Sequence, residues 1–574
     1  MKNRELAQIF TNIADLLAIQ GAEQRRVLAY RRAAENLESL GQEASELWQE
    51  GKLTQIPGVG KAIAAKIDEL LSSGELAFFE ELTADVPASL LEVLKVADVG
   101  PKRAALFWRE LDITSVDELA EAAAAGRLQT LSGMGVRTES RILENVKALR
   151  RRASDRISIG AAWPLASDLL ARLRLMPGVA RTEAGGSLRR WRETVGDIDL
   201  VVAAEDEAAL MEAFLAFPEI ERVLGQGVTK ASVELQGGLR AQLWVHPPEH
   251  FGTALQYATG SQAHNVRLRE LARTKGLSLS EHAFTRPDDS QDYCADEQDV
   301  YKTLGLPWIP PELREDRGEV QAAIEGKLPN LIKAEQVIGD LQIHSTWSDG
   351  NASILEMAEA ARQQGLKYIA ITDHSRSLGV ARGLTTERLE QQRQEIIEAQ
   401  RILGDDIRVL HGSEVEVLAD GSLDFPDDVL AELDVVVASV HTSLRQPRER
   451  ITERMLGAIR NPHVDVIAHP SGRMIGRRDP ADLDMERIMQ ASAEHGVALE
   501  INAHPDRLDL NEVHARRAVE LGCRLSINTD AHQPEDFALR TYGVAIARRA
   551  WVQAESVITT WPLARILQWL KSRE

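Results

Sequence analysis

The chain is poor in cysteine and has no long apolar run. Only Cys294 and Cys523 occur in 574 residues, far apart, so neither a disulfide framework nor a cysteine-based zinc finger can be built. No apolar stretch approaches the roughly 20 residues that span a bilayer. Residues 1–10 lack the core of a signal peptide, and no segment is of low complexity. These absences predict a soluble, cytoplasmic protein without membrane contact.

The sequence also lacks an excess of basic residues. Its net charge of -21 argues at first sight against nucleic acid, because phosphate binding usually leaves a basic footprint. However, bound cations offset the carboxylates of a metal centre, and backbone amides can hold phosphates without side-chain charge. With 44% apolar and 27% charged residues, the chain is globular, and its length predicts about three to five compact units.

Seven short apolar runs after residue 339 each end at a side chain of the kind that binds metals. They are 340–344, 368–374, 409–414, 435–441, 464–469, 497–502 and 524–532. Such runs separated by helix-like stretches indicate parallel strands joined by helices, and in a closed barrel their carboxyl ends point to one face. The side chains brought together there would be His344, Asp349, His374, Glu414, His441, His469, Asp530 and His532.

Imidazole and carboxylate groups together suit Zn or Mn in a hydrolytic centre that clamps a phosphate. Any one of these histidines could instead cap a strand or hydrogen-bond in the core. Ten of the 14 histidines lie after residue 340, and five of them hold the same strand-end position, which core packing does not require. We therefore interpret the segment as a phosphoesterase with a metal site.

The motifs in this segment resemble the polymerase and histidinol phosphatase (PHP) domain. They are Gly339 to Gly350, Thr372-Asp373-His374, Ser439-Val440-His441 and Asp530-Ala531-His532. The resemblance implies a distorted (β/α)7 barrel holding two or three Mn and/or Zn ions. Gln342 departs from it, because many PHP domains place a histidine there and an amide is a weaker ligand. Asn502 and His504 lie at another strand end and could be ligands or substrate contacts.

Helical periodicity dominates residues 1–150, interrupted by three glycine-containing turns. Glycines let a turn approach a phosphate, and the following helix offers its free amino-terminal amides. A single turn of this kind is usually only a helix connection. Three of them resemble helix-hairpin-helix motifs, which hold the DNA backbone without reading sequence. The predicted DNA contacts are Gly58, Gly60, Lys61, Gly100, Lys102, Gly133 and Gly135.

The middle of the chain carries a nucleotidyltransferase pattern. Asp197 and Asp199 would lie on one face of a strand, where they can hold two divalent cations against a triphosphate. The preceding turn with Gly186 and Ser187 offers amides and a hydroxyl, Arg190 can reach a phosphate oxygen, and Gly196 adjoins the first aspartate. An Asp-x-Asp pair alone is commonly a surface strand end, but the Gly-Gly-Ser turn about ten residues before it favours the specific interpretation.

Together these features resemble a bacterial family X DNA polymerase with a carboxyl-terminal PHP domain. Tyr257-Ala258-Thr259-Gly260-Ser261 matches the segment that opens the family's thumb, with Ala258 replacing Phe, and 304–315 looks like the thumb's end. By position, Tyr257, Gly260, Asn265 and Arg269 would contact the nucleotide or the template. Lys66 matches the lysine that can form a Schiff base with an abasic sugar, although the alternative is a solvated helix lysine.

The resemblance divides the chain into six segments. We predict a helical lyase-like domain with a helix-hairpin-helix at 1–85, helical fingers at 86–155, an α+β nucleotidyltransferase palm at 156–246, a thumb at 247–317, a linker at 318–335 and the PHP barrel at 336–574. The basic stretch 147–156 is either a solvated helix end or a phosphate contact.

One departure affects the polymerase site. The family's third catalytic carboxylate falls at Gln242, and a neutral amide is a poor metal ligand and base. Glu234 could substitute if the connecting loop were three residues, 237–239, which would place it opposite Gln242. A two-residue Gly237-Gly238 turn, the commoner hairpin, would instead pair it with Ala241, so we expect no substitution.

The function we predict is a family X repair polymerase that fills gapped or primed DNA from deoxynucleoside triphosphates with Mg or Mn in the palm. The PHP centre would remove 3′ nucleotides and could cut at abasic sites, and the chain would act as a monomer. The alternatives are a 3′ end-processing nuclease whose polymerase site is impaired by Gln242, a small-molecule phosphatase and a non-catalytic DNA-end scaffold.

Overall fold

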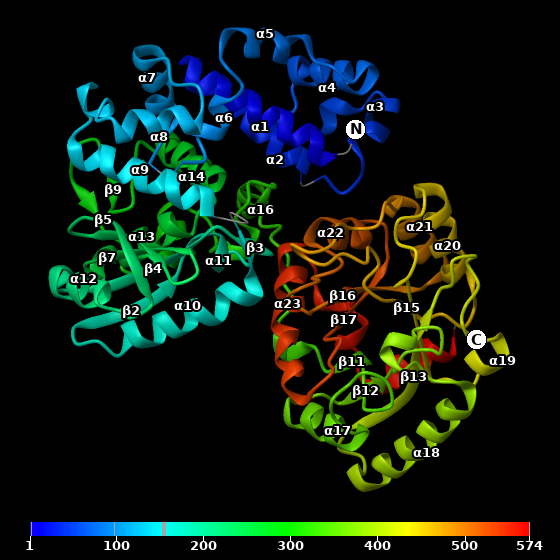
Figure 1. Cartoon of the computed structure of the whole chain (residues 1–574). Coiled ribbons are helices and arrows are strands. Elements are labelled where there is room, and N and C mark those ends of the chain that lie inside the picture. The colour runs from blue at the N-terminus through cyan, green and yellow to red at the C-terminus, as the bar shows by residue number, and fades with distance from the viewer. Residues whose placement is uncertain (2, 39, 97, 152–155, 573–574) are drawn as a thin grey trace. The chain divides into compact units, whose positions relative to one another are not determined.

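The computed structural model describes residues 1–574 except 2, 39, 97, 152–155 and 573–574, with only the backbone of 147–151. It divides into two compact units. One comprises Met1–Arg156, Met176–Ala180 and Val202–Pro247, and the other Ile157–Leu175, Arg181–Val201 and Pro248–Glu574. Figure 1 shows the elements along the chain. Within the described residues, no helix has the length and apolar character that crossing a membrane requires.

Helices make up the chain as far as residue 151. They are α1 (Asn3–Gln20), α2 (Gln24–Glu38), α3 (Ala44–Gln49), α4 (Lys61–Ser73), α5 (Ala77–Asp85), α6 (Leu90–Val93), α7 (Pro101–Leu111), α8 (Val116–Ala124) and α9 (Val136–Arg151). In α1, Leu6, Phe10, Ile13 and Leu17 recur at helical spacing and are fully buried. One continuous apolar core runs from Leu6 to Val146. Of the basic stretch 147–156, residues 152–155 lie outside the described residues.

The three glycine-containing turns adopt one geometry. In each, a backbone amide donates to the carbonyl three residues earlier: Val59 to Ile56, Val99 to Val96 and Met134 to Leu131, at 3.0–3.1 Å. The residue before that amide is left-handed in all three, with φ of 75° at Gly58, 65° at Asp98 and 76° at Gly133. A helix follows each turn, namely α4, α7 or α9. The structure therefore repeats the hairpin three times, once with aspartate in the glycine position.

A five-stranded sheet follows, in the order β2-β4-β7-β6-β5. Its strands are β2 (Val179–Ala184), β4 (Asp197–Ala204), β5 (Ile220–Gln226), β6 (Lys230–Leu235) and β7 (Arg240–His246). The last three pair antiparallel. Other elements of this region are α10 (Ile159–Arg174), α11 (Gly186–Arg189), α12 (Glu207–Leu215) and the pair β1 (Ile157–Ser158) with β3 (Thr194–Val195).

Residues 251–324 form a small helical region with its own apolar core, which includes Leu268, Phe284, Tyr301 and Leu313. Its elements are α13 (Phe251–Thr259), α14 (Gln262–Thr274), β8 (Ser278–Leu279), β9 (Phe284–Thr285), β10 (Gln291–Asp292), α15 (Glu297–Thr303) and α16 (Glu319–Ile324). The three short strands form one sheet in the order β10-β9-β8.

The carboxyl-terminal region is a barrel of seven parallel strands in sequence order. They are β11 (Gly339–Ile343), β12 (Tyr368–Ile371), β13 (Arg408–Glu416), β14 (Val435–Ser439), β15 (Val466–Ile467), β16 (Ala498–Asn502) and β17 (Arg524–Asn528). Beyond the ends of β11 and β17, a parallel bridge joins Ile343 to Ala531, and the His344 amide donates to the Ala531 carbonyl at 2.9 Å. The sheet is thus nearly closed, as expected for a distorted (β/α)7 barrel.

Helices surround the barrel. They are α17 (Ile354–Gln363), α18 (Thr386–Leu403), α19 (Asp427–Leu430), α20 (Arg448–Arg460), α21 (Met485–His495), α22 (Glu512–Glu520), α23 (Arg540–Arg549) and α24 (Leu563–Lys571). Alternate strand residues such as Leu341, Tyr368 and Val466 share a core with Ile566 and Leu570 of α24. The Tyr368 hydroxyl donates to the carbonyls of Ile558 and Trp561. Because Tyr368 begins its strand, α24 packs near the end opposite the strand termini that carry the predicted ligands.

Candidate metal centre and nucleotidyltransferase motifs

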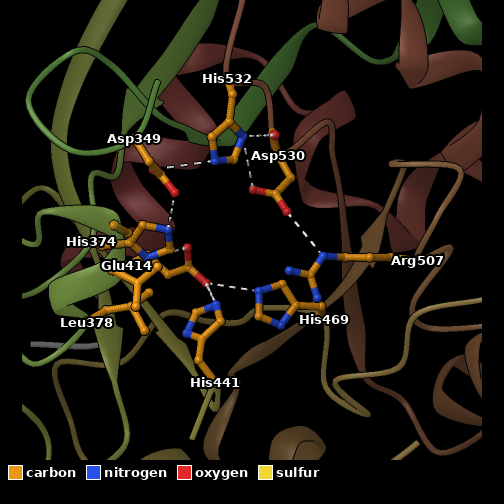
Figure 2. A pocket seen from close by; sticks show the side chains of 11 residues that line it. Asp349, His374, Leu378, Glu414, His441, His469, Arg507, Asp530 and His532 are labelled. Atoms are coloured by element: carbon orange, nitrogen blue, oxygen red, sulfur yellow. Dashed lines mark hydrogen bonds and ion pairs between the residues drawn. The ribbon is translucent and has the colours of Figure 1, made fainter. Parts of the chain in front are cut away.

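The predicted metal ligands converge at the carboxyl ends of the barrel strands. Seven of the eight line one cavity of about 230 Å³ (Figure 2): Asp349, His374, Glu414, His441, His469, Asp530 and His532. The eighth, His344, is fully buried behind them, with Nε2 3.1 Å from Asp530 Oδ1. The fold thus assembles side chains spread over 189 positions of the chain, because parallel strands deliver their ends to one face.

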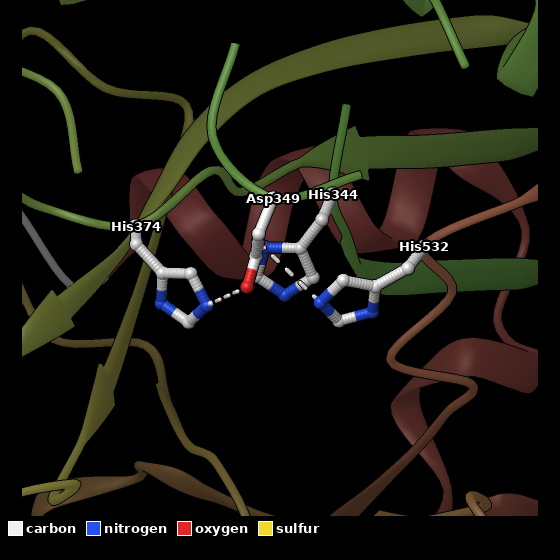
Figure 3. Close-up of side chains that lie close together, drawn as sticks. All are labelled: His344, Asp349, His374 and His532. Carbon is white, nitrogen blue, oxygen red and sulfur yellow. Dashed lines mark ion pairs between the residues drawn. The ribbon is translucent and has the colours of Figure 1, made fainter. Parts of the chain in front are cut away.

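The ligand atoms fall into three overlapping groups. His344, Asp349, His374 and His532 form the first (Figure 3), His374, Glu414 and His441 the second, and His344, Glu414 and Asp530 the third. Glu414 lies at the centre: its Oε2 is 3.2 Å from His374 Nδ1, and its Oε1 is 2.9 Å from His469 Nε2. Shared ligands are typical of centres in which neighbouring ions act on one substrate.

These donors fit divalent metal ions. Both ring nitrogens of His344 are buried and form no hydrogen bond, and neither does Nδ1 of His469. A buried polar atom without a hydrogen-bond partner destabilises the fold. An imidazole nitrogen that faces carboxylates avoids this penalty when it ligates a cation. Nitrogen and carboxylate ligands together suit Zn or Mn, so the structure supports metal binding here without identifying the ion.

The electrostatics of the cluster agree with this interpretation. Burial by itself would raise the pKa of the Glu414 carboxyl, but the imidazoles of His374, His441 and His469 hold that pKa well below its usual range. Burial opposes protonation of His374 and His532, yet neighbouring carboxylates raise the pKa of both imidazoles to about 9. Without metal, protons on these histidines offset the acidic charge that a cation would otherwise neutralise.

Gln342 lies in β11, two residues before the candidate ligand His344, and is fully buried. In the orientation that satisfies both ends of its amide, the nitrogen donates to Glu500 Oε2 at 3.2 Å. Glu500 also accepts from the His469 backbone amide at 2.7 Å and from Asn528 Nδ2 at 2.8 Å. Burial and the neighbouring Asp530 raise the Glu500 pKa well above its usual value. The amide that replaces the family's histidine is therefore tied into a buried hydrogen-bond network.

Asn502 and His504, the two further candidates at the end of β16, make different contacts. Asn502 donates from Nδ2 to Asp530 Oδ2 at 3.0 Å and accepts the His504 amide on Oδ1, so its amide orients a metal ligand. The ring of His504 accepts the Asp506 backbone amide at 3.3 Å. Neither residue lines the cavity.

Sequence reasoning missed Arg507 and an apolar group beside the centre. Arg507 lines the cavity with Nε 3.5 Å from Asp530, and its buried Nη1 has no hydrogen-bond partner. Figure 2 shows its guanidinium pointing toward the cluster. Leu378, Val380 and Ala381 also line the cavity. A signal existed for Arg507, which stands five residues after Asn502 in a turn that follows a barrel strand.

The nucleotidyltransferase motif forms as predicted at the local level. Asp197 and Asp199 alternate with the buried Ile198 and Leu200 and so share the other, half-exposed face of β4. Gly186 has φ of 57°, and a Cβ built there would lie 2.1 Å from the Asp199 carboxylate. Only glycine fits this close approach, which brings the start of α11, with Ser187, against the aspartate. Gly196 directly precedes β4.

Arg190 is engaged by protein groups instead of solvent. Its Nε lies 3.1 Å from Glu315 Oε1, and its Nη1 donates to the Thr259 carbonyl at 2.5 Å. Arg549 of α23 donates to the Arg190 carbonyl and lies 3.1 Å from the same Glu315. The residue predicted to reach a phosphate is thus held in a buried ion-pair network, in which Arg190, Arg192 and Arg549 keep the pKa of Glu315 below its usual range despite burial.

The thumb candidates lie at the junction of α13 and α14. Asn265 is buried, accepts from Gln256 Nε2 at 2.7 Å and donates to the Tyr257 carbonyl at 2.8 Å. Arg269 donates from Nε to the Asn265 carbonyl at 3.3 Å. Gly260 ends α13 with φ of 68°. Asn265 therefore joins the two helices, while Tyr257 and Arg269 are only partly buried.

The hairpin that carries Gln242 does not have the register we expected. Leu235 donates to the Leu239 carbonyl and Gly238 to the Leu235 carbonyl, which makes a three-residue loop of 236–238. Gln242 therefore pairs with Ser232, and Glu234 pairs with Arg240, so all four share one face. The prediction of a two-residue turn was wrong. Glu234 lies on the Gln242 face, one pair further along, with its carboxylate 2.7 Å from Arg222 Nη2.

The helical hairpins place their glycines at the starts of helices. Gly60 and Gly100 are the N-caps of α4 and α7, and Gly135 directly precedes α9. Lys61 and Lys102 are exposed at or next to the first residue of their helices. In the middle hairpin Asp98 forms an ion pair with Arg141 of α9 at 2.8 Å.

Lys66 lies on α4 with its Nζ 4.6 Å from the centre of the Phe78 ring. Arg26 approaches the same ring at 5.2 Å, and Tyr30 stacks on it with ring centres 5.9 Å apart. The lysine predicted for Schiff-base chemistry is therefore half-buried in an aromatic and basic cluster.

Comparisons with known proteins match these regions in order. Family models match as a helix-hairpin-helix domain at residues 1–76, a SAM-like helix-hairpin-helix tandem at 90–148, a DNA polymerase beta thumb at 254–315 and a PHP domain at 340–504. Over 577 residues the chain is 37% identical to the DNA polymerase/3′-5′ exonuclease PolX of Bacillus subtilis (strain 168), covering 100% of both chains.

Two other relatives each match part of the chain. DNA polymerase lambda of Rattus norvegicus is 27% identical over 342 residues, which cover 54% of this chain and 56% of that protein. A probable phosphatase of Thermoanaerobacter sp. (strain X514) is 29% identical over 252 residues, covering 42% of this chain and 96% of the phosphatase. The full-length match and the order of the domains agree with the fold and the metal centre. The chain therefore belongs to the bacterial family X DNA polymerases that carry a carboxyl-terminal PHP domain.

Proposed function

We propose that the protein is a DNA polymerase with a metal-dependent 3′-5′ exonuclease in its PHP barrel. The observation that carries the exonuclease is the convergence of eight imidazole and carboxylate side chains, seven of which form three overlapping groups of candidate ligands. The Bacillus subtilis relative, named DNA polymerase/3′-5′ exonuclease PolX, supports both activities.

The residues of the barrel would divide the work of cleavage among them. Divalent ions such as Mn or Zn, two or three in number, would supply electrophilic polarisation of the phosphodiester and activation of water. His344, Glu414 and the other six ligands would hold those ions, and Asn502 keeps Asp530 oriented. Arg507 lines the site, its buried Nη1 has no hydrogen-bond partner, and its guanidinium would hold a phosphate oxygen there. Because water is activated by the ions, no separate general base is required.

In the polymerase palm, Asp197 and Asp199 would hold Mg or Mn. Gly186, Ser187, Arg190 and Gly196 would bind the triphosphate, with Tyr257, Gly260, Asn265 and Arg269 near the nucleotide. Arg190 must then exchange its partner Glu315 for a phosphate or act through its ion pair. The hairpins with Lys61 and Lys102 would hold gapped or primed DNA, and Lys66 would serve abasic ends. We further propose that the protein is a cytoplasmic monomer. Its first five segments would end at residues 85, 155, 246, 317 and 335.

Trimming of a 5′-labelled oligonucleotide with Mn and without nucleotides tests the exonuclease. We expect a ladder of shortened products that a chelator abolishes and that His344→Ala reduces at least about 100-fold, because this residue belongs to two ligand groups. The matched control is His495→Ala, at the exposed end of α21. Equal trimming by both variants would place the nuclease elsewhere. Hydrolysis of a small phosphate ester in preference to DNA would favour a phosphatase.

A second candidate is a 3′ end-processing nuclease whose polymerase site has lost synthesis. Gln242 favours it, because the third carboxylate of the family is an amide here and Arg222 already pairs with Glu234. We expect Gln242→Asp to raise primer extension by at least about tenfold over the wild type, since a carboxylate ligates metal and accepts a proton where an amide does not. Wild-type extension at the same rate as the variant would reject this candidate.

A further inference from the structure

An apolar lip borders the metal centre on one side. Leu378, Val380 and Ala381 line the same cavity as the ligands. Val380 is 100% exposed, the most exposed large apolar side chain among the described residues. Of the other two, Leu378 is partly exposed and Ala381 is buried. Single exposed apolar residues are common on protein surfaces, but an exposed valine beside two further apolar residues that line one polar cavity indicates a contact with an apolar part of a ligand.

The loop that carries the lip is held at both ends. Ser375 forms a bridge with Leu384, whose amide donates to the His374 carbonyl at 2.7 Å. The Ser377 amide donates to Asp424 Oδ2 at 2.7 Å. A Cβ at Gly383 would lie 1.9 Å from the Ser375 carbonyl oxygen, so the two strands of the loop close tightly only because this residue is glycine.

The tip of the loop is also a compact turn. Ala381 donates to the Leu378 carbonyl at 3.0 Å and Arg382 to the Gly379 carbonyl at 3.1 Å. The exposure of Val380 is therefore set by a hydrogen-bonded turn of the backbone. A side chain presented in this way is pre-organised for a contact, because little conformational entropy is lost when a ligand covers it.

The lip lies across the cavity from the guanidinium of Arg507, which is paired through Nε with Asp530 (Figure 2). The loop begins directly after the ligand His374, and Figure 2 shows Leu378 beside His374 and Glu414 while Arg507 lies beyond His469 and Asp530. A ligand that places an anionic group between the metal ligands and Arg507 would therefore meet an apolar surface on the side of His374. A nucleotide has this distribution, with a charged phosphate on one side of the sugar and a flat, weakly polar base on the other.

We propose that Leu378, Val380 and Ala381 form a subsite for the nucleobase of the terminal nucleotide of the DNA strand that is being trimmed. This inference rests on the proposed exonuclease function and adds the contact that selects its substrate. The aliphatic side chains cover one face of the base, so the contact depends on the presence and size of the base and not on its hydrogen-bonding edge. Purine ends then bind more tightly than pyrimidine ends, and an end without a base loses the contact.

The test compares two 5′-labelled oligonucleotides that differ only in the last residue, an adenine nucleotide or a tetrahydrofuran abasic residue. For the full-length protein with Mn, we expect Val380→Ser to raise KM for the adenine end about fivefold, because an apolar contact of side-chain size is lost. KM for the abasic end and kcat for both ends stay within about twofold of the wild type. Val380→Trp is expected to lower KM for the adenine end by enlarging the apolar surface.

The matched control is Ile397→Ser, which removes a 56% exposed apolar side chain from α18, away from the cavity lining. It should leave both substrates unchanged. A KM ratio of adenine to abasic ends that is the same in the wild type, Val380→Ser and Val380→Trp overturns the subsite while leaving the exonuclease intact. Equal loss on both ends also overturns it, since the lip would then contact the backbone or another protein. Absence of trimming by the wild type overturns the proposed function and the subsite together.

Discussion

Gln342 is the departure from the PHP pattern at the metal centre. It stands where many PHP domains have a histidine, and its amide nitrogen is directed to Glu500, which three other donors also contact. The adjacent group of His344, Glu414 and Asp530 is left with three protein ligands from different strands. A group with three ligands binds its ion more weakly than one with four, such as the group of His344, Asp349, His374 and His532.

We expect Gln342→His to strengthen metal binding at the group of His344, Glu414 and Asp530 by about 10- to 100-fold, because it adds an imidazole ligand. Metal content after dialysis and competition with a chromophoric chelator measure this without any assay of activity. Gln364→His, at the exposed end of α17, is the control for a histidine added elsewhere. Unchanged stoichiometry and affinity in Gln342→His would show that position 342 does not reach a metal.

Metal binding should depend on pH through His374 and His532. Carboxylates beside them raise the pKa of both imidazoles to about 9 in the metal-free protein, although burial acts in the opposite direction. A protonated imidazole cannot ligate, so an ion must displace these protons below pH 9. Apparent affinity should therefore rise with pH between 6.5 and 8.5, by up to about tenfold per unit for each proton displaced. Chelator competition at three pH values measures it, and a flat or falling affinity would contradict these proton positions.

At the scale of elements, one of the three helical hairpins carries a charged residue at the left-handed position of its turn. Gly58 and Gly133 take the left-handed position of their turns, whereas Asp98 takes it in the middle turn with φ of 65°. Its carboxylate contacts Arg141 and Asn145 of α9, so it joins two hairpins at the surface where a phosphate would approach. An aspartate there opposes the binding of an anion, and we infer that the middle hairpin contributes least to DNA affinity.

Replacing Asp98 tests whether its carboxylate weakens DNA binding by the middle hairpin. Asp98→Gly keeps the left-handed turn, removes one negative charge, and loses a partly exposed ion pair with Arg141 and the hydrogen bond from Asn145. We expect about two- to fivefold tighter binding of gapped DNA at low salt and a smaller gain at high salt, because the effect is electrostatic. Fluorescence anisotropy at two salt concentrations measures this. Weaker binding would mean that the carboxylate organises the hairpins more than it repels phosphate.

Some of these elements could be predicted from the sequence, and others required the structure. The seven barrel strands and the convergence of the side chains at their ends were predictable, since β-branched runs and strand-end histidines are local signals that a parallel barrel brings to one place. The β6–β7 register was not, because Gly237 and Gly238 are compatible with two loop lengths. Val380 lies on a loop whose course depends on tertiary hydrogen bonds, and no sequence period marks it, whereas Arg507 was marked only by its place shortly after a barrel strand.

At the scale of the molecule, two chemistries occur in one chain. The palm motif of Asp197 and Asp199 suits nucleotide addition, and the barrel centre suits removal. We propose that Gln242 weakens addition, because Glu234 on the same face of the hairpin is paired with Arg222 and does not replace the missing carboxylate. The barrel centre has no comparable loss beyond Gln342. We therefore expect trimming to exceed extension in the wild-type protein, so that the chain acts mainly on DNA ends.

The most direct measurement follows a 5′-labelled primer on gapped DNA with Mn, with and without nucleotides, for the wild type, His344→Ala and Asp199→Asn. If the two sites act independently, His344→Ala abolishes shortening and retains any extension. Asp199→Asn then abolishes extension and retains shortening. Shortening that survives in His344→Ala, or that disappears in Asp199→Asn, would contradict a nuclease located in the PHP barrel.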